Sequence, residues 1–129
     1  MGVDRFDGPE LEYLKQVLER GRLSGQNDGF HGKLERAFAE AYGSKFAVAA
    51  NAAMSLLISA VFAADAGAGD EVLCDPLVQF HAIGALWMNA HPTWADVHPD
   101  TWLMDPESAR ANITPQTKAI VVTNLWGQP

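Results

Sequence analysis

The chain has 129 residues, of which 48% are hydrophobic and 19% are charged, and its formal net charge is -7. This size fits one domain or part of one, with enough apolar residues to form a core. The acidic balance disfavours nucleic acid and anionic membrane surfaces as partners, because both carry negative phosphates. The residues after Met1 lack an apolar signal core, and no apolar run reaches the roughly 18 residues of a membrane span.

Two amphipathic helices are predicted in the N-terminal part of the chain. Apolar residues share one face of 10–19 and one face of 30–42, and Gly43 is placed to end the second helix. Residues 21–29 between them are polar and rich in glycine, which is typical of a loop.

After residue 45, short apolar strands alternate with helices. Strands are predicted at 46–50, 71–74, 93–97 and in the β-branched run from Lys118, and helices at 53–64, at 80–89 and from 105 onward. Strands separated in this way form a mainly parallel sheet with helices on its faces. We therefore predict an α/β fold in which 1–45 supplies helices and a loop and 46–129 forms the sheet. The helix at 53–64 is apolar nearly all round, so we expect it to be buried.

The only cysteine, Cys74, lies at the end of an apolar strand run. A single thiol forms no intrachain disulfide, and we expect Cys74 to be a small buried apolar residue. One free thiol suits a reducing compartment, so the predicted location is the cytoplasm.

The junction between the strand at 46–50 and the following helix is the first candidate site. Asn51 is placed to cap the helix, and the amides of a helix start attract phosphate. Ala52 and Ala53 are small enough to let an anion approach the backbone, and Ser55 adds a hydroxyl. The alternative interpretation is a capped, buried helix with no ligand.

A second candidate follows the strand at 71–74. Phe80 lies where an aromatic ring could stack on a planar ligand, although packing in the core is the plainer interpretation. His81, at a helix start, is expected to be a surface or capping residue. The histidines are scattered without ligand spacing, so no metal site is predicted, and no P-loop or nucleophile elbow is found.

Several short motifs occur in a specific order. They lie at 21–25, 35–49, 67–72, 95–101, 113–120 and 125–129. In this order and spacing they resemble the DegT/DnrJ/EryC1/StrS family of sugar aminotransferases, which depend on pyridoxal 5'-phosphate (PLP). The resemblance covers Pro9 to Pro129 and implies the large domain of the aspartate-aminotransferase type.

The resemblance implies roles for residues at both candidate sites. Ala53, Met54 and Ser55 would bind the PLP phosphate, and Phe80, or alternatively Gln79, would stack on the pyridine ring.

One departure from the family affects the phosphate site. The family has a Ser-Gly-Thr-like triplet where this chain has Ala52-Ala53-Met54. One hydroxyl is lost and the backbone amides remain, so we expect weaker PLP binding by this chain alone.

The resemblance also implies a substrate region and an activity. Ser24 and Gly25 would lie near the sugar, often at a dimer interface, so a homodimer or self-association is expected. The complete enzyme would move an amino group from an amino acid, commonly glutamate or glutamine, to a free or nucleotide-linked keto-sugar.

No catalytic residue is assigned to this chain. The resemblance places the lysine that binds PLP and the aspartate that pairs with its ring nitrogen after Pro129, so the isolated chain is expected to be inactive. The alternative is a truncated homologue that acts as a binding or partner subunit.

Overall fold

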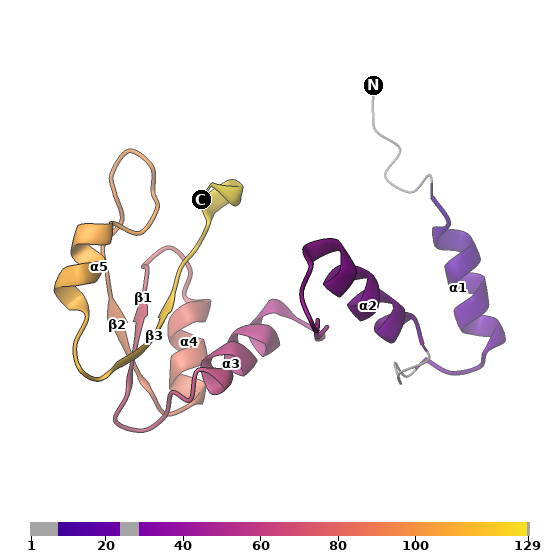
Figure 1. The fold of residues 1–129 in the computed structure, drawn as a ribbon, viewed down its shortest axis with the longest axis horizontal. Coiled ribbons are helices and arrows are strands. Elements are labelled where there is room, and N and C mark those ends of the chain that lie inside the picture. Colours follow the sequence, from indigo (N-terminus) through magenta and orange to yellow (C-terminus); the bar gives the residue numbers. More distant parts are fainter. Residues whose placement is uncertain (1–7, 24–28, 129) are drawn as a thin grey trace. The chain divides into compact units, whose positions relative to one another are not determined.

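The computed structural model describes residues 8–23 and 29–128, which belong to two compact units, Met1–Ala49 and Ala50–Pro129 (Figure 1). The first unit contains α1 (Glu10–Glu19) and α2 (Phe30–Tyr42). The second contains α3 (Ala53–Ala63), β1 (Glu71–Cys74), α4 (Phe80–Trp87), β2 (His91–Trp94), α5 (Pro106–Asn112), β3 (Thr117–Val121) and the short 3-10 helix η1 (Leu125–Gly127).

Both helices of the first unit begin and end where the apolar pattern predicts. Gly43 ends α2 with φ at +64°, a left-handed conformation that glycine adopts without strain. The rings of Tyr13 in α1 and Phe30 in α2 lie 5.1 Å apart between centroids, so aromatic packing links the two helices.

The strand predicted at 46–50 is not formed. The segment has no regular secondary structure, and no described strand pairs with it. The carboxylate Oε1 of Glu35 accepts a hydrogen bond from the Ala49 amide at 3.0 Å, and His31 Nε2 lies 3.1 Å from the Ala49 carbonyl oxygen. Side chains of α2 therefore satisfy both backbone groups of Ala49, as a neighbouring strand otherwise would.

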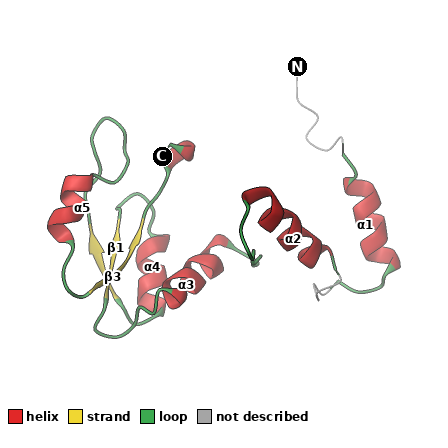
Figure 2. Cartoon of the chain, in the orientation of Figure 1, coloured by secondary structure: helices red, strands yellow, loops and turns green. Residues whose placement is uncertain are grey.

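The second unit is built on a parallel sheet with the strand order β2-β1-β3 (Figure 2). The central strand is β1, whose Val72 lies opposite Pro92 on β2 and Ala119 on β3. The predicted strand at 93–97 instead begins at His91 and ends at Trp94. Proline cannot donate to a strand ladder, so β2 is suited to the edge position that it occupies.

Helices cover both faces of this sheet. The path from β1 through α4 to β2 runs in the opposite direction to the path from β2 through α5 to β3. Right-handed crossovers therefore place α4 and α5 on opposite faces, as Figure 1 shows. Val72 and Cys74 of β1 pack with Val61 of α3 and Ala85 of α4 in the core.

The prediction that the helix at 53–64 is buried was wrong. Val61 is the one residue of α3 that is buried, and Phe62 is 68% exposed. The helix is apolar all round, but α4 covers one side of it and leaves much of the remaining surface to solvent.

Candidate functional site

The starts of α3 and α4 form the candidate site. Met54, in the first turn of α3, places its Cε 3.6 Å from the position that a Cβ would take at Gly84 in α4. Phe80 lies one turn before Gly84 on the same face of α4. The structure thus brings the predicted phosphate residues and the predicted stacking residue to the starts of two packed helices.

The start of α3 has open backbone donors. Ala52 occupies the N-cap position in an extended conformation, with no side-chain cap. The Ser55 amide donates to the Ala52 carbonyl at 3.1 Å, so the amides of Ala53 and Met54 precede the first helical hydrogen bond. Two amides at the positive end of a helix dipole fit a phosphate. The Met54 side chain packs against α4.

The prediction that Asn51 caps this helix was wrong. Asn51 lies one residue too early, and its Oδ1 accepts a hydrogen bond from the Ser55 hydroxyl at 2.7 Å. The Ser55 hydroxyl would therefore have to leave Asn51 before it could donate to an anion. The open donors at this junction are the amides of Ala53 and Met54.

Two residues compete for the position over a planar ligand. Phe80 is the first residue of α4 and is 43% exposed, and Gln79 directly before it is also exposed. Both remain available to a ligand, but only Phe80 offers an aromatic ring.

The predicted substrate residues Ser24 and Gly25 lie outside the described residues.

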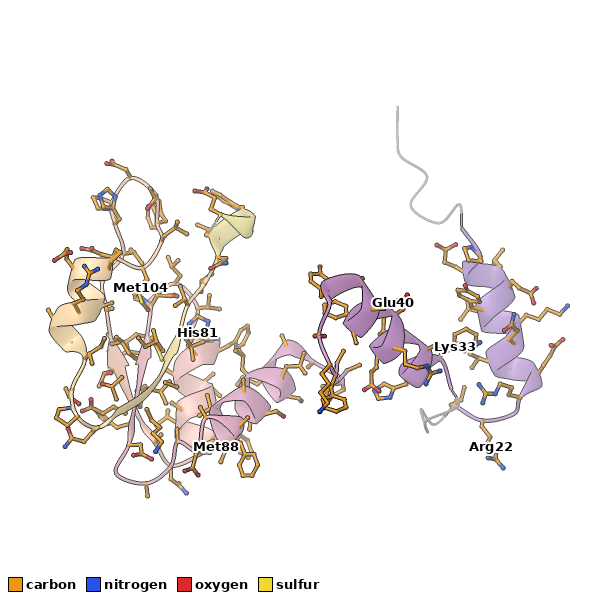
Figure 3. All side chains as sticks on the ribbon, in the orientation of Figure 1. Arg22, Lys33, Glu40, His81, Met88 and Met104 are labelled. Atoms are coloured by element: carbon orange, nitrogen blue, oxygen red, sulfur yellow. The ribbon has the colours of Figure 1, made fainter. Side chains whose placement is uncertain are left out.

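The prediction that His81 is a surface or capping residue was wrong. His81 is 6% exposed, beside Asp75, which is fully buried. Figure 3 labels His81 at the start of α4, close to the carboxyl ends of the strands. The sequence offers one signal for this pair, because Asp75 directly follows the apolar residues 72–74 of β1 and is carried into the interior with them.

Cys74 is fully buried, as predicted. Its thiol donates to the Val72 carbonyl at 3.4 Å. Burial, and to a lesser extent the neighbouring Asp75 carboxylate, raises the pKa of Cys74 from 9.0 to about 11. The thiol is therefore in its unreactive, protonated form at neutral pH.

The described part of the chain shows neither a membrane-spanning helix nor a metal-binding cluster. None of its helices has the length and apolar character that crossing a bilayer requires. Residues 8–23 and 29–128 also hold no cluster of three or more histidine, cysteine or acidic side chains that could bind a metal.

Known proteins share both this sequence pattern and this fold. The L-glutamine:2-deoxy-scyllo-inosose aminotransferase of Streptomyces kanamyceticus is 38% identical over 90% of this chain and 29% of its own length. The aminotransferase from Psychrobacter cryohalolentis is 32% identical, with a TM-score of 0.84, over 100% of this chain and 33% of that chain. The chain spans 28–34% of the length of the curated relatives it matches.

A more distant structure carries the expected cofactor. The GDP-4-keto-6-deoxy-D-mannose-3-dehydratase of E. coli, with bound hydrated PLP, is 23% identical with a TM-score of 0.85. The match covers 99% of this chain and 34% of that chain, and at this identity it shows the fold alone.

The family profile matches residues 5–129, nearly the whole sequence. With the relatives above, this match shows that the chain belongs to the DegT/DnrJ/EryC1/StrS aminotransferase family.

Proposed function

We propose that this chain forms the N-terminal part of an aminotransferase that uses PLP. The enzyme moves an amino group from an amino acid, such as glutamine, to the keto group of a free or nucleotide-linked sugar. Membership of the family and the named activity of the Streptomyces kanamyceticus relative support this proposal.

One observation carries the proposal. The open amides of Ala53 and Met54 lie at the start of α3, and α3 packs on α4, whose first residue is Phe80. In open α/β sheets, ligands bind beyond the carboxyl ends of the strands, and α4 begins shortly after the carboxyl end of β1. A phosphate on the amides and a planar ring near Phe80 together match the chemistry of PLP.

These residues bind and orient rather than react. The amides of Ala53 and Met54 donate hydrogen bonds to the phosphate, and the dipole of α3 favours its negative charge. The Phe80 ring packs on one face of the pyridine ring and keeps water from it. When bound, PLP supplies the electron-accepting ring and the carbonyl through which amino groups are exchanged.

The described part of the second unit has one lysine, Lys118, and its position does not suit catalysis. Lys118 lies in the first half of β3, away from the carboxyl ends of the strands. Its Nζ lies 4.0 Å from a carboxylate oxygen of Asp65. We therefore expect no amino transfer from these 129 residues alone, and turnover of glutamine by the purified chain would contradict that expectation.

The remaining assignments extend the same proposal. Residues 1–45 contribute Ser24 and Gly25 to the sugar site, and 46–129 contribute the PLP site. A second copy of the chain is the proposed partner, since both units expose large apolar side chains. The cytoplasm is the proposed location, because the one thiol is free and buried. Light scattering over a concentration series tests self-association.

Removing one backbone donor tests the PLP site directly. Ala53→Pro deletes the Ala53 amide hydrogen at the first helical position, which tolerates proline, and the extended Ala52 before it is compatible. We expect the chain to stay folded and to bind PLP several-fold more weakly by equilibrium dialysis. Ala53→Ser, which retains the amide hydrogen, is the control. Failure of the wild-type chain to bind PLP, or equal binding by Ala53→Pro, would refute the proposed site.

A further inference from the structure

A cluster of polar side chains, with Asp75 and His81 buried and Thr123 partly buried, joins β1, α4 and β3. Asp75 follows β1, His81 is the second residue of α4, and Thr123 follows β3. Asp75 Oδ2 accepts a hydrogen bond from the Thr123 amide at 2.6 Å, and Oδ1 accepts one from the Thr123 hydroxyl at 3.2 Å. Oδ1 also accepts from the Leu77 amide at 3.0 Å.

His81 completes this cluster from α4. Its Nε2 lies 3.5 Å from the Thr123 hydroxyl oxygen, and its Nδ1 lies 3.7 Å from Asp75 Oδ2. Nδ1 is buried and has no hydrogen-bond partner in the described part of the chain. A buried nitrogen without a partner lowers stability, so stability alone does not explain a histidine at this position.

The cluster fixes the start of α4 in space. A buried carboxylate that accepts several hydrogen bonds holds its partners in one geometry, because any other arrangement would leave the buried charge without those bonds. The hydrogen bonds between Asp75 and Thr123 join the carboxyl ends of β1 and β3, and the contact of His81 Nε2 with the Thr123 hydroxyl joins the first turn of α4 to the end of β3. Phe80 directly precedes His81, and successive helical side chains point about 100° apart. With the His81 ring directed inward, Phe80 is left half-exposed at the edge of the site.

We infer that Asp75, His81 and Thr123 are positioning residues that set the orientation of Phe80 for stacking on the planar ring of the bound cofactor. This inference rests on the proposed function, since it assigns the cluster to the same PLP site. The cluster acts through Phe80, and the hydrogen bonds described above link its members to one another and to Leu77, not to the amides of Ala53 and Met54.

The test compares a ligand that has a ring with one that has none. PLP and inorganic phosphate are titrated separately into the 129-residue chain, and the NMR shifts of the Ala53 and Met54 amides are followed. In His81→Leu and Thr123→Val we expect PLP affinity to fall about tenfold, in line with the loss of one aromatic contact, and phosphate affinity to stay within about twofold. Thr123→Ser, which restores the hydroxyl, should recover PLP affinity. His91→Leu, at an exposed histidine of β2, is the matched control and should change neither.

A double-mutant cycle separates positioning from general packing. In a Phe80→Leu background, His81→Leu should produce no further loss of PLP affinity, because the residue through which it acts is already gone. Additive losses, or parallel losses of PLP and phosphate affinity, would overturn the inference. Wild-type affinity for PLP in both His81→Leu and Thr123→Val would overturn it too, while leaving the proposed function intact. Absence of PLP binding by the wild-type chain would instead refute the proposed function, and the inference with it.

Discussion

The starts of α3 and α5 both have an extended N-cap residue, but only one of them has a side-chain cap. Each N-cap residue is extended, but Asp105 caps α5 by accepting a hydrogen bond from the Glu107 amide at 2.9 Å, whereas Ala52 offers α3 no side-chain cap. α5 also begins with Pro106, which lacks an amide hydrogen. One helix start is therefore satisfied within the chain, and the other keeps its donors for a ligand. A helix start without a side-chain cap leaves amides that a ligand can bind.

The largest expected effect comes from separating α3 from α4. Gly84→Leu places a side chain where Met54 and Leu57 already lie, and overpacking of this kind lowers the unfolding free energy by about 1–3 kcal/mol. It should also weaken PLP binding, because the two helix starts move apart, while the cap of α5 stays intact. Chemical denaturation and PLP titration measure the two effects.

Gly84→Ala is the matched control for that variant. A Cβ at Gly84 would meet Met54 and Leu57 at 3.6–3.8 Å, which is ordinary contact distance. Alanine is also the better helix former, so we expect stability to rise by about 0.5–1 kcal/mol. A loss of stability in Gly84→Ala would show that the two helices pack more tightly than described.

Giving α3 an aspartate N-cap like that of α5 should weaken PLP binding and raise the unfolding free energy. In Ala52→Asp the new carboxylate accepts from the open amides and repels phosphate, so PLP affinity should fall at least about tenfold. The unfolding free energy should rise by about 1 kcal/mol. Ala52→Asn caps without charge and separates occupancy of the amides from repulsion. Unchanged PLP affinity in both variants would contradict the view that these amides hold the phosphate.

The reverse change at α5 should affect stability alone. Asp105→Ala removes the hydrogen bond to the Glu107 amide and should lower the unfolding free energy by about 1 kcal/mol. Because α5 covers the other face of the sheet from α3, PLP affinity should be unaffected. A clear change in PLP affinity would show that the two helix starts are coupled through the sheet.

The last expected effect is a dependence of stability on pH through Cys74, which lies at the carboxyl end of β1. Its folded-state pKa of about 11 exceeds the unfolded value of 9.0. Its contribution to stability is therefore fully present below pH 9 and is lost as pH rises through about 11. Denaturation curves at pH 8 and pH 10 should show a loss of stability in the wild type and a smaller loss in Cys74→Ala. Equal losses would mean that another group titrates in this range.

The apolar periodicity predicted the positions of the helices and strands better than it predicted which residues are buried and which groups they bond to. The apolar spacing gave the bounds of α1 and α2, and alternating strands and helices gave the parallel sheet. The pattern could not show that side chains of α2 satisfy Ala49, because the partner of a backbone group is a matter of tertiary structure. The burial of His81 was missed for the same reason, since Thr123 lies 42 residues away.

The position of the candidate site could be predicted from the sequence, but the residue that takes the N-cap of α3 could not. A helix following a predicted strand pointed to the junction at 51–55, although that strand is not formed, and the resemblance to the family implied a cofactor there. Whether Asn51 or Ala52 takes the N-cap depends on a shift of one residue in the helix start, which short polar side chains do not fix.

Pro92 makes the β2 edge of the sheet less able than the β3 edge to pair with a further strand. The amides of His91 and Ala95 point inward to the carbonyls of Asp70 and Cys74, so alternation directs position 92 outward, where proline has no hydrogen to give. An incoming strand would find a gap in the donors along the outer side of β2. The outer side of β3, which no described strand occupies, has no such gap. Further strands, whether from the same polypeptide or from a misfolded neighbour, are thus directed to β3.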